Sequence, residues 1–583
     1  MPLSNDFLTL KDALGFARAK GATSSRELQL ALVCGFAPLY LPDLVAAYLR
    51  RKDASLSVNW RVGSYGGFRG NLAKALSSGD TSLVVAVEWS DLDPRLSLRN
   101  GSRLRVAQLE EISREAASAI QDIARVISTS GAGSRLVGVL PSLPLPPFDH
   151  VGAHQNAEWK AALRRAVAGA ASELLRAGVR LVDPEFLDNH SPPSARHDLE
   201  AELAFGFPFS RSYASVMASA LAALLAPATA KKGLIVDLDN TLWKGILGED
   251  GIEGVHWLLE DGAQHHGAFQ RFLGLLHDAG VLLAIVSKNE PALVDAALAR
   301  GDLLVDPSFF SPVMAGWEPK STYVAEVLRR WNVGADAVVF VDDSPFELAE
   351  VTKAQPGVVG VQFPGRPGEI GACLRQLREL FAKPALSPDD ALRARSIESG
   401  QAFAQSLAAT GDPAAFLRSL QGTISITGLP PSNAARSLEL INKTNQFNLN
   451  GIRLSEPEWQ ALCTRQSTFV ERVTYEDRLG QLGTVAALYG QHGHGALVVE
   501  GFVLSCRAFS RRIEHHLVAS LFNRTAGDTI LFRFATTSRN HLTGEFLEAI
   551  GAIPDDSGWR LDRATFFRGF EEFHRVELLK EER

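Results

Sequence analysis

The stretch LIVDLDNTL at residues 234–242 decides the fold at the centre of this chain of 583 residues. An apolar run ends there in Asp237 and Asp239, and Thr241 follows two positions later. Side chains alternate along an extended strand, so the two carboxylates point to the same side where the strand ends. Ligands of open α/β sheets bind beyond the carboxyl ends of the strands. The stretch therefore predicts a buried strand that carries two carboxylates to a ligand site.

Two aspartates at such a position have a limited set of uses. They can hold Mg²⁺, or one can attack phosphorus while the other transfers a proton. The same short pattern also fits an aspartate-rich helix cap or a calcium loop. The motif needs its context before these readings can be separated.

Three further motifs supply that context, and each follows an apolar run or begins a helix. VLLAIVSKN (281–289) contains Ser287, whose hydroxyl suits a phosphate oxygen. WEPKSTYVAEVL (317–328) predicts a helix beginning at Lys320, where an ammonium group and a helix N-terminus can both face an anion. VVFVDDSP (338–345) ends in a second acidic pair, Asp342 and Asp343. The order favours a metal-dependent phosphate site over a cap or a calcium loop.

The spacing between these motifs describes the entrance to the site. Only 45 residues separate Thr241 from Ser287, and 32 lie between Ser287 and Lys320. Neither interval is long enough for a separate cap domain. We therefore expect an open site, which suits a large substrate or a partner protein that brings the phosphate.

The order of the four motifs resembles the haloacid dehalogenase (HAD) phosphatase superfamily. The resemblance implies that Asp237 is the nucleophile and forms an aspartyl-phosphate, and that Asp239 protonates the leaving group and later activates water. It also implies phosphate-binding roles for Thr241, Ser287 and Lys320. Its Mg²⁺ ligands would be Asp237, Asp342 and the backbone carbonyl of Asp239, with Asp343 at the metal or just behind it.

Longer strings resemble a narrower group, the FkbH-like proteins of polyketide biosynthesis: DLDNTLWKGILGEDGIEG (237–254), SKNE (287–290) and VFVDDSPFE (339–347). This resemblance implies transfer of a glyceryl unit from 1,3-bisphosphoglycerate, a small phosphorylated acyl donor. The remaining phosphate is removed, and the acyl group is loaded on the phosphopantetheine thiol of an acyl carrier protein. Three later segments resemble that family's C-terminal acetyltransferase-like domain: 441–459, 475–488 and 499–518.

The chain departs from the FkbH-like pattern at three places. Val286 stands where a cysteine is common, and Gln481 stands for an acid. The segment around Asn540 lacks the usual aromatic residue. The first departure leaves the phosphate chemistry intact, whereas the other two concern acyl transfer and substrate.

The whole chain reads as a multidomain α/β protein. Apolar strands alternate with amphipathic helices over 1–228, predicting an SGNH-like α/β domain, and over 229–380, predicting a HAD-like parallel sheet without a large cap. Residues 381–425 read as a helical connector, and 426–583 as an acetyltransferase-like (GNAT-like) α+β domain. A hydrolase of the SGNH type would place its nucleophile near 33–40, which contains no serine. Without it the nearby acid and histidines, Asp188, His190 and His197, make no triad, so we expect this domain to be non-catalytic.

The last domain contains a candidate acyl acceptor. Cys506 ends an apolar strand and is followed by three arginines, Arg507, Arg511 and Arg512. Nearby cationic charge raises the thiolate fraction of a cysteine, and the same arginines are the best candidate for a basic surface that docks an acidic carrier protein. The alternative is an ordinary buried strand cysteine.

A group of amides in the same domain, Asn445, Gln446 and Asn448, could hydrogen-bond a hydroxyacyl group or a pantetheine amide. The alternative is a polar loop next to a helix.

Composition narrows the function classes. The chain has 59 basic and 66 acidic residues, a net charge of −7, which argues against a nucleic-acid-binding protein. Four cysteines without a CxxC pair indicate a reducing compartment. The uncharged stretch 212–230 keeps its larger apolar residues on one helical face, which predicts a buried helix and no membrane association. We therefore expect a cytoplasmic protein.

Three functions remain open from the sequence. The first is a Mg²⁺-dependent glyceryl transferase and phosphatase that feeds an acyl carrier protein. The second is a simple phosphatase of a small phosphate ester. The third is a non-catalytic scaffold that binds a carrier protein, against which the four intact motifs count.

Overall fold

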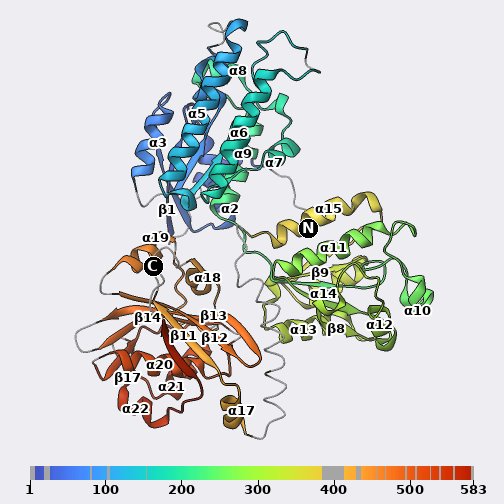
Figure 1. Ribbon diagram of the computed structural model, residues 1–583, viewed down its shortest axis with the longest axis vertical. Helices are drawn as coiled ribbons and strands as arrows, with labels where there is room; N and C mark the ends of the chain where they lie inside the picture. Colours follow the sequence, from blue (N-terminus) through green and yellow to red (C-terminus); the bar gives the residue numbers. More distant parts are fainter. Residues whose placement is uncertain are drawn as a thin grey trace. The chain divides into compact units, whose positions relative to one another are not determined.

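The described part of the computed structural model contains three separate sheets, each with its own helices (Figure 1). The structure describes residues 7–18, 26–78, 82–100, 105–152, 154–383, 403, 412–428, 435–444, 446–454, 456–465, 468–492, 496–505, 508–525, 527–537, 540–555 and 558–579. The chain divides into two compact units, Pro2–Thr229 and Ala230–Arg583. Within the described residues, no helix is long and apolar enough to cross a membrane.

The first unit contains a parallel sheet of five strands in the order β2-β1-β3-β4-β5. Its strands are β1 (Arg26–Val33), β2 (Leu56–Val62), β3 (Ser82–Ala86), β4 (Leu136–Val139) and β5 (Arg180–Leu181). Its main helices are α1 (Leu10–Arg18), α2 (Leu41–Lys52), α3 (Phe68–Ser77), α5 (Leu109–Thr129), α6 (Glu158–Arg176), α7 (Pro184–His190), α8 (Leu199–Phe205) and α9 (Arg211–Leu225).

Helices cover both faces of this sheet, as a parallel sheet requires. Leu30 and Leu32 of β1 pack on the side of α1, α2 and α9, whereas Ala31 and Val33 pack on the side of α3, α5 and α6. The helix predicted within 212–230 is α9, and most of its residues are buried. The alternation of apolar strands and helices expected over 1–228 is confirmed.

The second sheet is also parallel and has the order β10-β9-β6-β7-β8. Its strands are β6 (Gly233–Val236), β7 (Leu282–Ser287), β8 (Phe310–Ala315), β9 (Val338–Asp342) and β10 (Val359–Gln362). Its helices are α10 (Leu247–Asp250), α11 (Gln264–Asp278), α12 (Pro291–Leu298), α13 (Lys320–Trp331), α14 (Pro345–Ala354) and α15 (Ile370–Phe381). Helices α11, α12 and α15 pack on one face, and α13 and α14 pack on the other.

The third sheet is mixed and has eight strands in the order β16-β17-β15-β14-β13-β12-β11-β18. These are β11 (Thr423–Gly428), β12 (Thr468–Asp477), β13 (Gly480–His492), β14 (Leu497–Leu504), β15 (Thr529–Phe532), β16 (Ile553–Asp555), β17 (Gly558–Asp562) and β18 (Arg575–Leu579). Helices α20 (Ile513–Arg524), α21 (His541–Ala549) and α22 (Arg563–Gly569) contribute to its main core. Helices α18 (Ala435–Lys443) and α19 (Glu456–Thr464) contribute to a second, smaller cluster.

The structure adds strands that the sequence reading did not contain. Strand β8 is only partly buried and lies at the edge of its sheet, so its apolar pattern is weak. In β12, apolar residues alternate with charged ones, and β16, β17 and β18 are short, so their sequences give little indication of strands. Most of the predicted connector 381–425 lies outside the described residues, which include α17 (Pro413–Ser419).

Gly233 tests how tightly the second sheet is packed. A Cβ at this position would come within 2.3 Å of the Trp331 ring on α13, the helix that begins with Lys320. We expect Gly233→Ala to destabilise the fold by about 1–3 kcal/mol, as overpacking does. Gly274 on α11 has open space around it, so Gly274→Ala should stabilise by up to about 1 kcal/mol. Chemical denaturation measures both, and equal effects would contradict this packing.

Candidate active site

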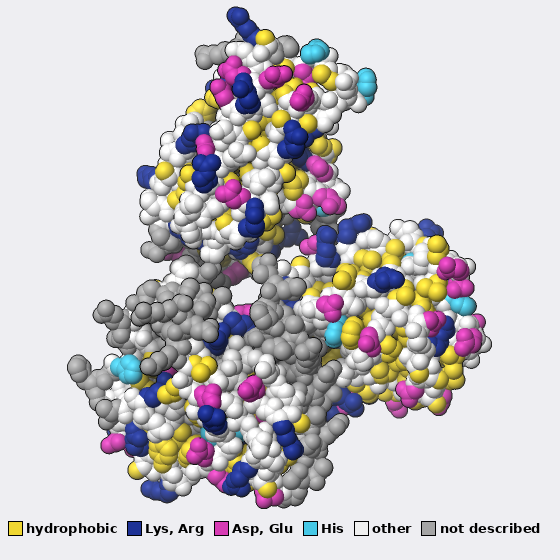
Figure 2. Space-filling view, in the orientation of Figure 1, with side chains coloured by type: hydrophobic (Ala, Val, Ile, Leu, Met, Phe, Trp, Pro, Cys, Tyr) yellow, Lys and Arg dark blue, Asp and Glu magenta, His cyan; other side chains and the backbone are white. Residues whose placement is uncertain are grey.

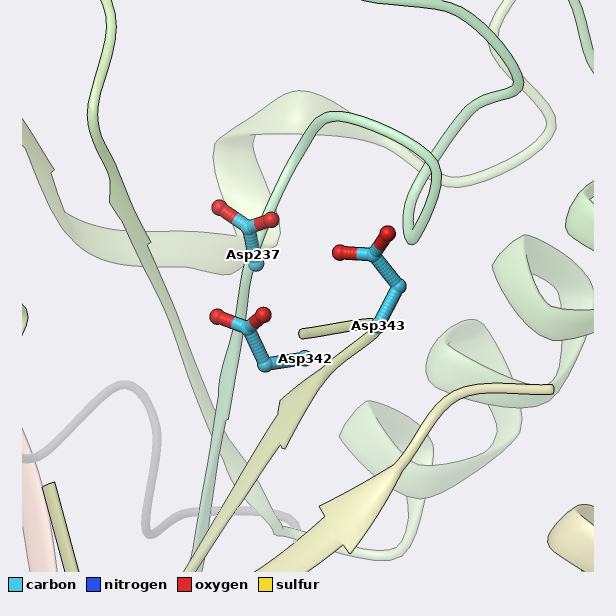
Figure 3. A group of neighbouring side chains, drawn as sticks. All are labelled: Asp237, Asp342 and Asp343. Atoms are coloured by element: carbon cyan, nitrogen blue, oxygen red, sulfur yellow. The ribbon is translucent and has the colours of Figure 1, made fainter. Parts of the chain in front are cut away.

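Three carboxylates converge where β6 and β9 end (Figure 3). These strands are neighbours, and their register pairs Val236 with Val341. The next residues, Asp237 and Asp342, are therefore adjacent at the carboxyl edge, and Asp343 follows. One oxygen from each carboxylate lies within 4.8 Å of the others. The fold thus brings members of both predicted aspartate pairs into one cluster.

Lys320 joins two of these carboxylates. Its Nζ lies 2.7 Å from an oxygen of Asp237 and 2.7 Å from an oxygen of Asp342, and all three side chains are buried. Burial by itself lowers the pKa of Lys320, but the two carboxylates outweigh that effect, so its pKa is raised overall. The lysine is therefore held as a cation at the first residue of α13.

The cluster keeps an excess of negative charge. Burial raises the pKa of Asp237 to about 7, although Lys320 acts in the opposite direction. The pKa of Asp343 is also raised, first by burial and then by the neighbouring charge of Asp342. Three carboxylates face one ammonium group, and hard carboxylate oxygens are the ligands that Mg²⁺ prefers. A divalent cation fits this donor set and would balance its charge.

Two hydroxyl groups lie at the same edge of the sheet. The Thr241 hydroxyl oxygen accepts a hydrogen bond of 3.1 Å from the backbone N–H of Asp343. The Ser287 hydroxyl oxygen accepts one of 3.1 Å from the side-chain amide of Asn289. Both hydroxyls are buried and keep an O–H that can be donated to a phosphate oxygen.

Asp239 lies beside the cluster and has its own partners. One carboxylate oxygen accepts from the indole N–H of Trp243 at 3.1 Å and from the backbone N–H of Leu247 at 3.0 Å. The other accepts from the amide of Asn289 at 2.9 Å. Its carboxylate is not part of the three-carboxylate cluster, and a ligand role for its backbone carbonyl stays a prediction.

Sequence reasoning missed two of the residues that position this site. Asn289 joins Asp239 to Ser287, and Trp243 fixes one oxygen of Asp239. The sequence itself indicates Asn289, because it is the third residue of the SKN string (287–289) at the end of β7. Trp243 carries no such signal because its role depends on how the loop after β6 folds back.

The segments between the motifs form no separate cap. Residues 154–383 are described without a gap. Between Thr241 and Lys320 they contribute α10, α11, β7, α12 and β8, which belong to the layers of the sheet itself. Beyond the strand ends lie short loops after β7, β8 and β9 and the longer segment 237–263 after β6, which contains α10.

The structure corrects part of the predicted carrier-binding surface. Arg511 is buried, with its Nε 3.3 Å from the Asp477 carboxylate and its guanidinium 4.1 Å from the centre of the Phe403 ring. It therefore cannot belong to an exposed basic cluster. Arg512 is exposed, whereas Cys506 and Arg507 lie outside the described residues.

Of the predicted amide group, only Asn448 has a structural role in the described residues. Asn448 is buried, and its amide donates to the carbonyls of Ile441 and Thr444. Its side-chain carbonyl oxygen accepts hydrogen bonds from the backbone N–H groups of Asn450 and Gly451. These bonds shape a loop, which is the alternative interpretation of the amide group. Gln446 is exposed, and Asn445 lies outside the described residues.

In the first unit, the side chains of Asp188, His190 and His197 each bond to a different partner and form no catalytic group with one another. Asp188 pairs with Arg196, and His190 bonds to the carbonyl of Phe186. His197 lies 2.7 Å from the carboxylate of Glu202.

The described cysteines lie in apolar surroundings. Burial raises the pKa of the Cys34 thiol to about 12 and that of Cys373 to about 11. It raises the pKa of Cys463 as well. All three are therefore held as neutral thiols, which is how packing cysteines behave.

No family model matches the chain, and no curated protein is significantly similar to it. Among solved structures, it is similar to the N-terminal part of the protein BF1531 from Bacteroides fragilis, which contains a phosphatase domain and was complexed with Mg. That alignment has 20% identity and a TM-score of 0.50, and covers 65% of this chain and 100% of the other. The likeness shows that the two proteins share a multidomain α/β fold.

A second solved structure aligns far less well. It is the GCN5-related glucosamine N-acetyltransferase region of a fungal multi-domain GH3 β-N-acetylglucosaminidase. The alignment has 11% identity and a TM-score of 0.17, and covers 95% of this chain and 68% of the other. So low a TM-score supports no conclusion about the fold of the last domain.

The charge excess at the cluster predicts stabilisation by Mg²⁺. A cation that binds only the folded state at a hundredfold excess over its Kd adds about 2.7 kcal/mol. We expect Mg²⁺ to raise the midpoint of thermal unfolding of the wild-type chain, and Asp342→Asn to lose most of that increase. Asp278→Asn, at an exposed position on α11, is the matched control and should keep it. An undiminished shift in Asp342→Asn would contradict a metal site here.

Asp237 also predicts a pH dependence of the metal-free chain. Folding raises the pKa of Asp237 from the usual value of 3.8 to about 7, so the folded chain binds this proton more tightly than the unfolded chain does. The stability gained from the bound proton is fully present below about pH 4 and is lost as pH rises through 7. With a chelator present, the free energy of unfolding of the wild-type chain should fall between pH 4 and 8 by at least about 1 kcal/mol more than that of Asp237→Asn. Denaturant titrations at several pH values measure the difference. Parallel pH profiles of the two proteins would show that Asp237 titrates normally.

Proposed function

We propose that this chain is a Mg²⁺-dependent phosphatase of the HAD type. The observation that carries the proposal is the buried cluster of Asp237, Asp342 and Asp343, with the ammonium group of Lys320 between the first two. Two hydroxyl donors, Thr241 and Ser287, lie at the same edge of the sheet. The likeness to a phosphatase-containing protein that was complexed with Mg supports the same chemistry.

The residues divide the reaction between them. A carboxylate oxygen of Asp237 attacks the phosphorus, and the bond from phosphorus to the ester oxygen breaks. Asp239 in its protonated form donates a proton to that leaving oxygen, and as a carboxylate it then takes a proton from the attacking water. The water oxygen bonds to phosphorus, inorganic phosphate leaves and the Asp237 carboxylate is restored. Lys320, Thr241 and Ser287 bind the phosphoryl oxygens throughout.

Mg²⁺ would be held by Asp237, Asp342 and Asp343, and when bound it offsets the negative charge that brings carboxylate and phosphate together. Asn289 and Trp243 orient Asp239 through the hydrogen bonds that fix both of its oxygens. The buried lysine keeps the Asp237 carboxylate in place before the substrate arrives.

The finer proposal concerns the substrate. We infer an FkbH-like enzyme that takes a glyceryl-type unit from 1,3-bisphosphoglycerate, removes its phosphate and delivers it as a thioester to an acyl carrier protein in the cytoplasm. The strings 237–254, 287–290 and 339–347 support this, and the open entrance suits a substrate carried by a protein. In this proposal the first domain is SGNH-like and non-catalytic, the last is GNAT-like, and Cys506 is the candidate acyl acceptor.

The alternative function is a simple phosphatase of a small ester. Two variants distinguish it from the glyceryl transferase. Asp237→Asn should abolish phosphate release, because an amide cannot attack phosphorus, and should leave a phosphoglyceryl group on the enzyme or carrier. Cys506→Ala should lose carrier loading but keep hydrolysis of a model ester. Intact-mass analysis of enzyme and carrier, incubated with Mg²⁺ and 1,3-bisphosphoglycerate, identifies these species.

That experiment can contradict the phosphatase part and the carrier-loading part of the proposal separately. Near-normal phosphate release by Asp237→Asn would overturn the phosphatase assignment. Normal loading by Cys506→Ala would mean direct transfer to the carrier thiol. Cys463→Ala, at a packing cysteine of the same domain, is the control for nonspecific effects of removing a thiol.

A further inference from the structure

The start of α13 sets the position of the Lys320 ammonium group, because Lys320 is the first residue of this helix. The backbone N–H groups in the first turn of a helix have no partner within the helix and must bond to something else. The residue before the helix, Pro319, gives no side-chain hydrogen bond to them. The first turn of α13 therefore depends on an acceptor from another element.

Glu350, on the neighbouring helix α14, provides that acceptor. One oxygen of its carboxylate accepts a hydrogen bond of 3.1 Å from the backbone N–H of Ser321, and the other accepts one from the Ser321 hydroxyl. The next backbone N–H, that of Thr322, bonds to the carbonyl of Pro319 at 3.0 Å. Hydrogen bonds to an ionised acceptor are the stronger ones, and negative charge is favourable at a helix N-terminus. Glu350 therefore caps α13 from outside the helix.

This cap changes how a phosphate can be bound at the site. The sequence predicted that the Lys320 ammonium group and the helix N-terminus could both face an anion, but the anion at this helix N-terminus is the Glu350 carboxylate. On the visible face of this domain, at the right of Figure 2, Lys and Arg side chains are interspersed with acidic and hydrophobic ones and form no basic patch. Contact with the negative phosphoryl oxygens therefore depends on where the Lys320 side chain is held.

Glu350 also closes a ring of contacts that begins and ends at Lys320. The Asp342 carboxylate contacts the Lys320 ammonium group at 2.7 Å with one oxygen and accepts from the backbone N–H of Ser344 at 2.9 Å with the other. Ser344 is the N-cap residue of α14, the helix that carries Glu350. Asp342 thus fixes the start of α14, and α14 in turn fixes the start of α13 through Glu350.

Apolar packing alone would not define this position as closely. Helices α13 and α14 lie side by side on one face of the second sheet (Figure 1), and Val324, Val327 and Val351 belong to the buried cluster between them and the strands. The hydrophobic effect is non-directional, whereas a hydrogen bond requires a particular distance and angle. The valines therefore bring the helices together, and the bonds of Glu350 fix the first turn of α13.

We propose that Glu350 is a positioning residue for Lys320. It holds the first turn of α13 so that the ammonium group meets the Asp237 carboxylate and the phosphoryl group of the substrate. This inference rests on the proposed phosphatase function and adds to it a residue that does not touch the substrate. Misplacement of a reacting or binding group by about 1 Å can cost about a hundredfold in rate, so loss of the cap should be visible in turnover.

The test measures hydrolysis of p-nitrophenyl phosphate by the full chain at saturating Mg²⁺. Glu350→Ala removes the cap, whereas Glu350→Gln keeps an oxygen that can accept from the Ser321 N–H and an amide that can bond to its hydroxyl. Glu326→Ala is the matched control, because Glu326 is an acid of α13 that pairs with Arg329 and Arg330, away from the helix start.

The three variants should differ in a fixed order. We expect Glu350→Ala to lose at least about tenfold in kcat/KM, Glu350→Gln to recover most of that loss, and Glu326→Ala to stay within about twofold of wild type. Thermal unfolding of each variant sets a temperature at which all of them are folded. An equal loss in Glu350→Gln and Glu350→Ala would mean that the bonds to Ser321 do not carry the effect, and would overturn the proposal.

A double-mutant cycle with Lys320→Met separates positioning of the lysine from a general effect on the fold. If Glu350 acts through Lys320, Glu350→Ala should change kcat/KM by less than about twofold once the ammonium group is gone. The Kd of inorganic phosphate, measured by calorimetry on the same four proteins, gives the cycle without relying on residual turnover. Losses of equal size with and without Lys320 would contradict a role that passes through this residue.

Failure of the cap and failure of the phosphatase give different results. An active wild-type chain whose Glu350→Ala variant stays within about twofold in kcat/KM would overturn the positioning role and keep the phosphatase. A wild-type chain that does not hydrolyse p-nitrophenyl phosphate with Mg²⁺ would overturn the phosphatase itself, and the role of Glu350 with it.

Discussion

The ammonium group of Lys320, held between two buried carboxylates, is the interaction on which the site depends. Asp237 and Asp342 sit at the ends of neighbouring parallel strands, where two adjacent negative charges repel each other in a medium of low dielectric constant. Lys320 offsets one of these charges and leaves the other, with Asp343, for a metal ion. Removing one partner from such a cluster leaves a buried charge without compensation, which is far more costly than losing a surface ion pair.

The architecture follows from the need to bring these groups together. The β6–β9 register places the two aspartates side by side, and α13 begins at the residue whose side chain reaches both. Gly233 allows the Trp331 ring of that helix to lie close against β6, which fixes the position of α13 relative to the strand. The lysine at the start of the helix and the aspartate at the end of the strand are therefore positioned by the same packing.

Much of the second domain could be predicted from its sequence because β6, β7 and β9 are buried on both faces and their sequences are continuous apolar runs. Asp237, Thr241, Ser287, Lys320, Asp342 and Asp343 were located from their places after such runs or at a helix start. The partners of Asp239 could not be found in this way, since they depend on the path of the loop after β6. The arginines after β14 were predicted to form an exposed cluster, and for Arg511 this prediction is wrong. A basic string suggests an exposed surface, but Arg511 lies inside, against Asp477 and Phe403. Only tertiary packing distinguishes these two positions for an arginine.

The central claim is that Asp237 attacks phosphorus, and the covalent intermediate tests it most directly. The wild-type chain can be mixed with p-nitrophenyl phosphate and Mg²⁺, quenched in acid within one turnover and analysed by peptide mass spectrometry. Our account predicts one phosphoryl group on the peptide that contains residues 234–242, located on Asp237, and none when Mg²⁺ is removed by chelation. A phosphoryl group on another residue, or phosphate release without any phosphorylated peptide at any quench time, would contradict it.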